Sequence, residues 1–388
     1  MAVRDRAVGR DRSGALTTTE AATTMRVRAA LFEAPGRPLA VRTIDLGGPG
    51  PRDALVRIDA VGICGSDLHV VKGEWVRPRP MVLGHEGAGV VEALGADVAG
   101  LAVGDRVILS WAPACGECGP CRAGRTTACL PLRAGIGAGT LPDGTTRLSE
   151  DGGTVFRMTA IGALAERVVM PASGVLKLTH ELPAAEAALL GCAALTGIGA
   201  ARGVAAGDVV VVIGAGGVGQ FCVQGARLRG AAAIVAVDPL PARRALARAV
   251  GATHDCDPSG LAELLAALAP DGADCALEAV GSPATAAAAL ASVRPGGRAT
   301  LVGMPPAGAR LDLDPAEFTN REKILTGTVY GSGDPGEALP ALLADVAAGR
   351  VLLAPLVGPS FPLERAEEAI QAALAGEPGR VIVTPQSS

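Results

Sequence analysis

A glycine turn between a valine-rich run and a helix-like segment constrains the fold of this chain most strongly. Residues 209–213 read VVVVI and pass directly into the turn GAGGVG at 214–219, and residues 220–229 can continue as a helix. Glycines permit a tight turn and let the backbone approach a pyrophosphate, whose charge meets the free amides at the start of the helix. The pattern predicts a dinucleotide site. The cofactor-binding residues predicted in it are Gly214, Gly216, Gly217, Val218 and Gly219.

An acidic residue at the end of the next valine-rich run supports this interpretation. Asp238 follows Gly214 by 24 residues, close to the offset of roughly 20 at which a carboxylate binds the adenosine ribose. A carboxylate there would repel a 2'-phosphate, so the sequence favours NAD over NADP. Arg243 leaves an alternative open, because it would contact either the ribose or a phosphate. The competing interpretation is an ordinary glycine turn with Asp238 as a helix cap.

The pattern of residue types changes along the chain. Short β-branched runs such as 54–61 and 89–94, separated by Gly, Pro and Asp clusters, predict a β-rich domain. After Pro183, alanine-rich helical stretches alternate with valine-rich runs, which is typical of a parallel sheet with crossover helices. We therefore expect an α/β protein. Its predicted parts are a disordered tail at 1–24, a β-rich domain at 25–193 and 331–388, and a doubly wound nucleotide domain at 194–330.

Composition excludes several classes of partner. The 35 basic residues are outnumbered by 39 acidic ones and only 2% of residues are aromatic, so we expect no nucleic-acid partner. Glycines interrupt the apolar stretches at 187–201 and 209–223, which fall short of the roughly 20 residues of a membrane span. Residues 1–24 lack the apolar core of a secretory signal. We therefore expect a cytoplasmic protein with reduced cysteines and no membrane partner.

Four cysteines on a Gly/Pro-rich loop have the spacing C-x2-C-x2-C-x7-C. Four thiolates so close in sequence can close a tetrahedral zinc site that leaves no position for substrate, and such a site is structural. The alternative is a group of free thiols on a surface loop, which would be prone to oxidation. The predicted ligands are Cys115, Cys118, Cys121 and Cys129.

Three further glycine-rich segments each contain a potential metal ligand. Cys64 lies in GICGSDLH at 62–69, His85 in GHEGAG at 84–89, and Cys192 in GCAALTG at 191–197. Taken singly, each residue could equally be a small buried hydrophobe or a core histidine with satisfied hydrogen bonds.

Together these motifs resemble the zinc-containing medium-chain alcohol dehydrogenase family. The run Gly84-His85-Glu86 with Gly89, Gly95 and Val98 is similar to the family's zinc signature, and the cysteine loop and glycine turn follow at the family's spacings. The resemblance extends over 25–384. It is closest to the long-form branch that includes thiol-dependent formaldehyde dehydrogenases, because 139–147 looks like the extra segment of that branch. It implies a GroES-like catalytic domain beside a Rossmann domain.

The resemblance also implies roles for individual residues. Cys64, His85 and Cys192 would bind a catalytic zinc with an open fourth position, so that each chain would hold two zinc ions. The remaining assignments are Ser66 as the group that accepts the alcohol proton, His69 as the group that passes it to solvent, Glu86 behind the metal, Asp67 as the carboxylate that orients His85, Arg380 on the pyrophosphate, and Trp111 in the substrate pocket.

We therefore expect an NAD-dependent zinc alcohol dehydrogenase that interconverts an alcohol with its aldehyde or ketone. Two alternatives are a dehydrogenase for the thiol adduct of formaldehyde and a nicotinoprotein that keeps its NAD bound. A remote alternative is a non-catalytic nucleotide-binding protein on the same fold. Gly65 stands where several relatives carry a cation, which favours faster cofactor release. The strand-like run at 324–330 suggests an edge for a homodimer or homotetramer.

Overall fold

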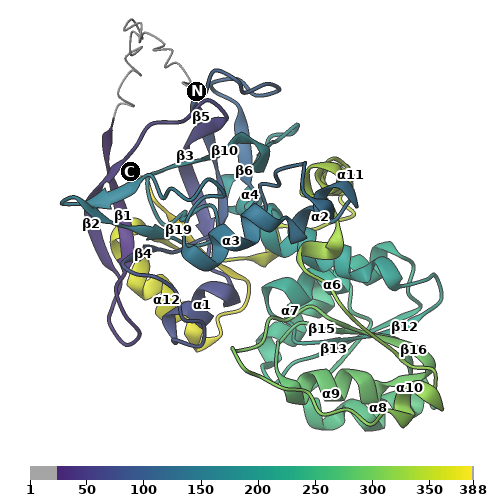
Figure 1. Cartoon of the computed structure of the whole chain (residues 1–388). Coiled ribbons are helices and arrows are strands. Elements are labelled where there is room, and N and C mark those ends of the chain that lie inside the picture. The colour runs from purple at the N-terminus through teal and green to yellow at the C-terminus, as the bar shows by residue number, and fades with distance from the viewer. Residues whose placement is uncertain (1–23, 387–388) are drawn as a thin grey trace, which may run out of the picture.

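The computed structural model describes residues 24–386. The predicted disordered tail at 1–24 lies outside the described residues except for Thr24. The described chain contains three sheets (Figure 1). Two of them form the β-rich part of the molecule, and the third is parallel. This arrangement confirms the predicted α/β class.

Two sheets form the β-rich part of the molecule. The first has the order β8 (Gly153–Thr154), β7 (Leu148–Glu150), β2 (Ala40–Leu46), β1 (Met25–Phe32), β4 (Met81–Val82) and β9 (Phe156–Arg157). The second has the order β11 (Val175–Lys177), β6 (Arg106–Leu109), β5 (Glu86–Leu94), β3 (Asp53–Gly62), β19 (Arg380–Thr384) and β18 (Val357–Pro362), with β10 (Arg167–Pro171) on β3. Short helices lie in the connections that lead from the second sheet to the first: α1 (Gly65–Val71) between β3 and β4, and α2 (Gly119–Arg122) and α3 (Leu130–Ala138) between β6 and β7.

The third sheet is parallel throughout. Its order is β14 (His254–Cys256), β13 (Ala233–Val237), β12 (Val209–Ile213), β15 (Ala273–Glu278), β16 (Val293–Leu301) and β17 (Ile324–Gly327). Numbered within the sheet, this is the 3-2-1-4-5-6 order of a doubly wound fold, in which ligands bind where the strand order reverses. Figure 1 shows α6 (Gly217–Leu228) and α7 (Pro241–Val250) on one face, and α8 (Leu261–Leu268) and α9 (Pro283–Ser292) on the other. The short helix α10 (Ala316–Thr319) precedes β17.

The valine-rich runs form the centre of this sheet because both of its faces are covered. Four of the five residues of β12 are buried, as are four of the five in β13, which explains why they read as continuous apolar runs. The last strand is shorter than expected: β17 ends at Gly327, and Tyr330 has a positive φ of 55° in a following turn. The three-residue strand β14 carries the polar sequence HDC and gives no strand signal.

One apolar segment is a longer helix than the sequence suggested. Its parts are α4 (Ala184–Leu189), a π-helical turn at Leu190–Ala194, α5 (Leu195–Ala200) and a final turn at Ala201–Gly203. The expectation that glycines break this stretch short of a membrane span is wrong, because 184–203 is continuous over 20 residues and is apolar enough to cross a membrane. However, 72% of its most apolar stretch is buried inside the protein, so its apolar side chains pack in the core.

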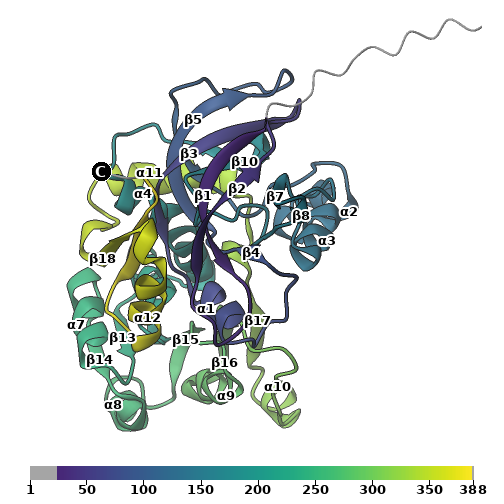
Figure 2. The ribbon, with the colours of Figure 1, turned by 90° about the vertical axis from the view of Figure 1, so that its left-hand side faces the viewer.

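The end of the chain returns to the β-rich part. After α11 (Pro335–Ala347) and α12 (Ala366–Ala375), β19 pairs antiparallel with β3, with Val383 opposite Val61. In Figures 1 and 2, α12 lies next to α1. The strand pairing thus joins residues far apart in the sequence, while the domain boundaries at 193/194 and 330/331 remain predictions.

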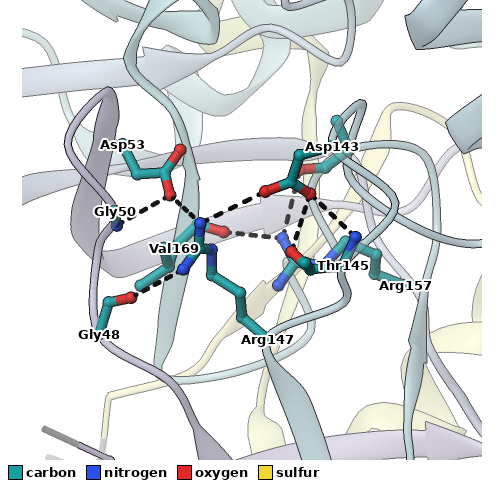
Figure 3. A network of polar contacts seen from close by, with 9 residues as sticks. Gly48, Gly50, Asp53, Asp143, Thr145, Arg147, Arg157 and Val169 are labelled. Carbon is teal, nitrogen blue, oxygen red and sulfur yellow. Dashed lines mark hydrogen bonds and ion pairs between the residues drawn. The ribbon is translucent and has the colours of Figure 1, made fainter. Parts of the chain in front are cut away.

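A polar network fixes the segment at 139–147 to the β-rich part (Figure 3). The Arg147 guanidinium lies between two carboxylates, with its Nη2 atom 2.7 Å from Asp53 Oδ2 and 3.4 Å from Asp143 Oδ2. Nearby, the fully buried Arg157 donates from Nη1 to the Val169 carbonyl at 2.8 Å. Burial lowers the pKa of Arg157 to about 9. The network anchors β9, which leads directly into a wall of the cavity described below.

Candidate active site

Four residues from three distant segments converge in the interior. Cys64, His85, Glu86 and Cys192 are all buried, and their potential ligand atoms lie within 4.8 Å of one another. Cys64 immediately precedes α1, His85 immediately precedes β5, and Cys192 lies in the π-helical turn. The structure thus brings together the three residues that the resemblance named as ligands, and it places Glu86, which the resemblance put behind the metal, in the same cluster.

Asp67 joins the loops that carry two of these residues. Its Oδ2 atom accepts a hydrogen bond from the Cys64 amide at 2.9 Å, and its Oδ1 atom accepts one from the Gly84 amide at 2.9 Å. Oδ1 also lies 3.5 Å from Nδ1 of His85. A carboxylate behind a ligating histidine fixes the orientation of the ring and leaves the other nitrogen for the metal. The position of Asp67 therefore suits the role that the resemblance implies.

The chemistry of the cluster fits a zinc ion. The neighbouring Cys192 sulfur, together with Arg380 and His85, lowers the pKa of the Cys64 thiol well below its usual range despite burial. A thiolate is the form of cysteine that binds metal. Two sulfur atoms and one imidazole nitrogen are a donor set that suits zinc, and this Cys2His set is the one known for the catalytic zinc of alcohol dehydrogenase.

Arg380 connects this cluster to the glycine turn. Its Nε atom is 3.0 Å from Oε2 of the fully buried Glu86, and Nη1 donates to the Ile63 carbonyl at 2.9 Å. Burial raises the pKa of Glu86 to about 8, although the Arg380 charge opposes this shift. Nη2 of Arg380 is buried without a hydrogen-bond partner among the described residues. It lies 2.5 Å from the place that a Cβ atom on Gly217 would occupy.

The glycine turn has the geometry expected for a pyrophosphate site. Gly214 has a φ of 92°, and a Cβ atom on Gly219 would lie 1.7 Å from the Gly214 carbonyl oxygen. At Gly216, which precedes the first residue of α6, a Cβ atom would meet nothing within 4 Å. The free amides at the start of α6 and the unpartnered Nη2 atom of Arg380 thus face the same space, as an anionic ligand requires.

Asp238 lies just behind this turn. Its two carboxylate oxygens accept backbone hydrogen bonds at 2.9 Å, Oδ2 from Ala215 and Oδ1 from Leu240. Arg243 Nη1 is 4.0 Å from Asp238 Oδ2. These contacts hold a negative charge at the carboxyl end of β13. The predicted contact of Asp238 with a ribose stays a prediction.

A cavity of about 690 Å³ connects the two groups of residues. Its lining includes Cys64, His85 and Cys192 at one end, and Gly216, Gly217, Val218, Arg243 and Arg380 at the other. The predicted proton-transfer residues Ser66 and His69 and the predicted pocket residue Trp111 also line it. One space is thus shared by the potential metal ligands and the nucleotide turn.

Sequence reasoning missed the residues that surround His69. The His69 Nδ1 atom hydrogen-bonds with a carboxylate oxygen of Glu74, and its ring stacks on Trp75 with 4.6 Å between centroids. The Trp75 indole then donates from Nε1 to the Pro305 carbonyl at 3.0 Å, across to the nucleotide-binding part. The sequence offered one signal for the contact between His69 and Glu74, which is their separation of five residues. This spacing matches no known motif.

Tyr330 was also missed as a site residue. Its hydroxyl group donates to the Gly191 carbonyl, next to Cys192, and its ring centroid is 4.9 Å from that of Trp111. Burial raises the pKa of Tyr330 well above its usual range. Tyr330 therefore contacts the metal-ligand segment from the chain that leaves β17, a contact that sequence spacing does not reveal.

The four-cysteine loop forms a second, separate cluster. The sulfur atoms of Cys115, Cys118, Cys121 and Cys129 lie within 4.8 Å of one another. Backbone amides point at them: Glu117 N donates to Cys115 Sγ at 3.4 Å, and Cys115 N donates to Cys129 Sγ at 3.4 Å. Amide donors, that of Leu130 first, lower the pKa of Cys118 to about 6. Four sulfurs with amide donors fit a closed tetrahedral zinc site.

We expect Cys118→Ser to reduce stability more than catalysis. The change removes one of the four sulfur atoms predicted to bind zinc, and a structural zinc site would contribute its binding energy to folding. The melting temperature should fall by more than about 5 °C, while the rate per folded, fully loaded molecule should change little. Differential scanning calorimetry and zinc analysis on the same sample provide the measurement. An unchanged melting temperature would argue against a structural site.

Comparison with known proteins places these features in one family. The family model described as an alcohol dehydrogenase GroES-like domain matches residues 50–180, and the one described as a zinc-binding dehydrogenase matches 217–347. The chain is 37% identical to putative alcohol dehydrogenase D of Mycobacterium tuberculosis, over 88% of this chain and 95% of that protein. It is 32% identical to an S-(hydroxymethyl)glutathione dehydrogenase of Photobacterium damsela subsp. piscicida, over 92% and 100%.

Solved structures agree with the sequence comparison. The crystal structure of an alcohol dehydrogenase zinc-binding domain protein from Burkholderia ambifaria has a TM-score of 0.89 and 32% identity. It covers 94% of this chain and 100% of its own. The similarity therefore includes both the β-rich part and the parallel sheet, and it confirms the predicted pairing of a GroES-like domain with a Rossmann domain.

Proposed function

The chain belongs to the zinc-containing medium-chain alcohol dehydrogenase family, and we propose from its site that it interconverts an alcohol with its aldehyde or ketone using NAD. The observation that carries the proposal is the shared cavity, which is lined by Cys64, His85 and Cys192 and also by the glycine turn. When bound there, zinc would stabilise the deprotonated alcohol and NAD would accept the hydride. We further propose two zinc ions per chain, one in each cysteine-containing cluster.

The protein's own residues would position the substrate and remove its proton. Ser66 and His69 lie in α1, directly after Cys64, and both line the cavity. A hydroxyl group next to the reacting oxygen can accept the alcohol proton, and an imidazole can pass it on. The His69 ring is held in place because its Nδ1 atom hydrogen-bonds with Glu74 and its face stacks on Trp75. Ser66 and His69 thus form the proposed path of the proton to solvent.

The nucleotide end of the cavity favours NAD. The Asp238 carboxylate is fixed at the carboxyl end of β13, where its charge would oppose a 2'-phosphate. Arg380 and the amides at the start of α6 would bind the pyrophosphate. Because Gly65 supplies no cation, one phosphate contact found in several relatives is missing, and we expect NAD to exchange readily.

The proposal also covers the assembly of the protein, its location and its partners. We propose a homodimer or homotetramer that uses the edge strand β17, where Ile324 is 40% exposed; the outer edge of a parallel sheet offers unpaired backbone groups to a second copy. A cytoplasmic location, small-molecule alcohols or aldehydes as partners, and no nucleic acid or membrane partner complete the proposal.

Nucleotide reduction by the purified protein tests this function. The zinc content is first quantified, and NAD is then mixed with primary, secondary and aromatic alcohols. We expect about two zinc ions per chain and a rise in NADH absorbance. Turnover only with formaldehyde plus a thiol would support the thiol-adduct alternative. No turnover with added NAD, but release of NAD on denaturation, would support the nicotinoprotein. One zinc ion or none would contradict the proposed catalytic metal.

A substitution of the proposed proton path gives a second check. We expect His69→Gln to slow alcohol oxidation by about 10-fold or more and to leave the zinc content unchanged. The slowing should be greatest below neutral pH, because the proton must then leave without an internal acceptor. The pH profile of kcat for the variant and the native enzyme provides the measurement. Loss of zinc in the variant would show that His69 acts as a ligand or a structural residue instead.

A further inference from the structure

Different side chains hold the three segments that carry the potential catalytic metal ligands. Asp67 holds two of them, because it accepts hydrogen bonds from the backbone amide of Cys64 and from that of the residue before His85. The third segment is the π-helical turn around Cys192. In the described part of the chain, Tyr330 is the one side chain that hydrogen-bonds with the backbone of this turn. The third ligand is thus held by a residue to which the proposed function gives no role.

The contact with Tyr330 fixes the backbone of Cys192 itself. The Tyr330 hydroxyl donates to the Gly191 carbonyl oxygen, which can accept more than one hydrogen bond and so need not give up its place in the helix. This carbonyl belongs to the peptide group between Gly191 and Cys192, and a peptide group is planar from one Cα atom to the next. A bond that fixes the carbonyl oxygen therefore also fixes the position of the Cys192 Cα atom.

Both partners of this hydrogen bond are held by their surroundings. A Cβ atom on Gly191 would lie 2.6 Å from the Leu109 carbonyl oxygen, so the glycine packs directly against the end of β6. Tyr330 is 5% exposed, and its hydroxyl oxygen also lies 3.3 Å from Oγ of Ser110. Burial raises the pKa of Tyr330 well above its usual range, so the hydroxyl stays protonated and can donate.

The turn that carries Tyr330 is attached to the same helix by other contacts. Gly331 packs so closely on α5 that a Cβ atom would lie 2.5 Å from the Leu195 carbonyl oxygen. Nη1 of Arg202 donates to the Ser332 carbonyl at 2.9 Å. Because these contacts do not involve the tyrosine hydroxyl, a substitution can remove the hydroxyl while the turn stays on the helix.

We propose that Tyr330 is a positioning residue for the catalytic metal, because its hydroxyl fixes the backbone that carries Cys192. A ligand that is already held in place loses little freedom when the metal binds. Hydrogen-bond partners of ligating residues commonly change metal affinity by about 10- to 100-fold. In this role Tyr330 acts through Cys192 and not on the substrate. The inference rests on the proposed function, since it takes a zinc ion at Cys64, His85 and Cys192 as its premise.

Zinc release from the native enzyme and from Tyr330→Phe measures this role. Phenylalanine keeps the ring and removes only the hydroxyl. The zinc-loaded proteins are mixed with the chromogenic chelator 4-(2-pyridylazo)resorcinol, and the phase that is absent from Cys64→Ser identifies the catalytic zinc. We expect Tyr330→Phe to speed release of this zinc ion by about 10-fold. Release from the four-cysteine cluster should not change, because the hydroxyl contacts lie at Gly191 and Ser110.

Hydrogen exchange reports on the same role whether or not the site holds zinc. Deuterium uptake by the backbone amides of residues 190–195 is measured by mass spectrometry on the full chain as purified. The hydroxyl bond restrains this turn, so Tyr330→Phe should increase the exchange rate there by about 10-fold. Exchange in β12, the central strand of the parallel sheet, should stay at the native rate.

The matched control is Ser332→Ala, which removes a hydroxyl from the same turn. Ser332 is exposed, and its Oγ atom hydrogen-bonds with Thr328 Oγ1 at 2.7 Å rather than with the metal-ligand segment. Alanine keeps the backbone carbonyl that accepts from Arg202. We therefore expect this variant to release both zinc ions, and to exchange at residues 190–195, at the native rates.

The outcomes separate this inference from the proposed function. A native rate of zinc release in Tyr330→Phe, or unchanged exchange at residues 190–195, would overturn the positioning role; NAD reduction by that variant with an alcohol would then leave the proposed function in place. Equal acceleration of both zinc ions would also overturn it, because it would reveal a general loss of stability. Faster exchange in a protein that holds zinc only at the four-cysteine cluster would support the hold of Tyr330 on the Cys192 backbone and contradict the proposed catalytic metal.

Discussion

Replacement of Cys64 by serine is expected to remove one zinc ion per chain and to slow alcohol oxidation by at least about 10³-fold. The two side chains are nearly the same size, so the fold should survive. However, a serine hydroxyl is a poor ligand compared with a thiolate, and the Cys64 sulfur lies within 4.8 Å of the other potential ligands. Zinc analysis and kcat measured on one preparation provide the test.

The matched control for this prediction is Cys275→Ser. Cys275 is also buried, but it belongs to neither cysteine cluster, and its sulfur lies 3.6 Å from the Gly203 carbonyl and from Asp208 Oδ2. A serine hydroxyl can donate to either acceptor, so this variant should keep two zinc ions and native activity. If Cys64→Ser kept both zinc ions and full turnover, the assignment of the catalytic metal would be wrong.

A methyl group at Gly219 is expected to disrupt the nucleotide turn. A Cβ atom there would lie 1.7 Å from the Gly214 carbonyl oxygen. The start of α6 and the turn that follows β12 would therefore have to move apart. We expect Gly219→Ala to lower the free energy of unfolding by about 2 kcal/mol or more and to weaken NAD binding by at least about 100-fold. Chemical denaturation and isothermal titration with NAD measure the two effects.

Gly216→Ala separates the two effects. A Cβ atom at Gly216 would meet no other atom within 4 Å, and this residue has an ordinary φ of −75°. The free energy of unfolding should therefore change by at most about 1 kcal/mol. The same methyl group would project into the space proposed for the pyrophosphate, so NAD should bind more weakly. Unchanged NAD affinity in both variants would show that the cofactor binds elsewhere.

The parts of the fold that the sequence predicted well are those with local signals. Strands β12 and β13 are buried on both faces, so their residues must be apolar and read as valine-rich runs. The glycine turn between β12 and α6 was predicted because its backbone conformation and close contacts require glycine. Strand β14 was missed because two of its three residues are polar. A strand at the edge of the sheet, as β14 is, can carry such residues.

The site residues that the sequence missed depend on contacts between distant segments. Trp75 and Tyr330 carry no motif, and they reach the site through stacking on His69 and a hydrogen bond to Gly191. The same limit explains the error on the apolar segment at 184–203. Its glycines were taken to interrupt it, but Gly197 packs against Phe221 of α6 so closely that a Cβ atom would lie 2.5 Å from the Phe221 Cβ atom. Tertiary packing, not local propensity, holds that helix.

Deuterium transfer from the alcohol to the nicotinamide tests the central claim most directly. The native enzyme is mixed with NAD and a primary alcohol that carries two deuterium atoms on the carbinol carbon. One carbon–deuterium bond breaks, its deuterium and electron pair pass to C4 of the nicotinamide ring, and the hydroxyl proton goes to solvent. We predict one deuterium per NADH formed, by mass spectrometry. NADH without deuterium, or aldehyde formed while NAD stays oxidised, would contradict direct hydride transfer to NAD in this cavity.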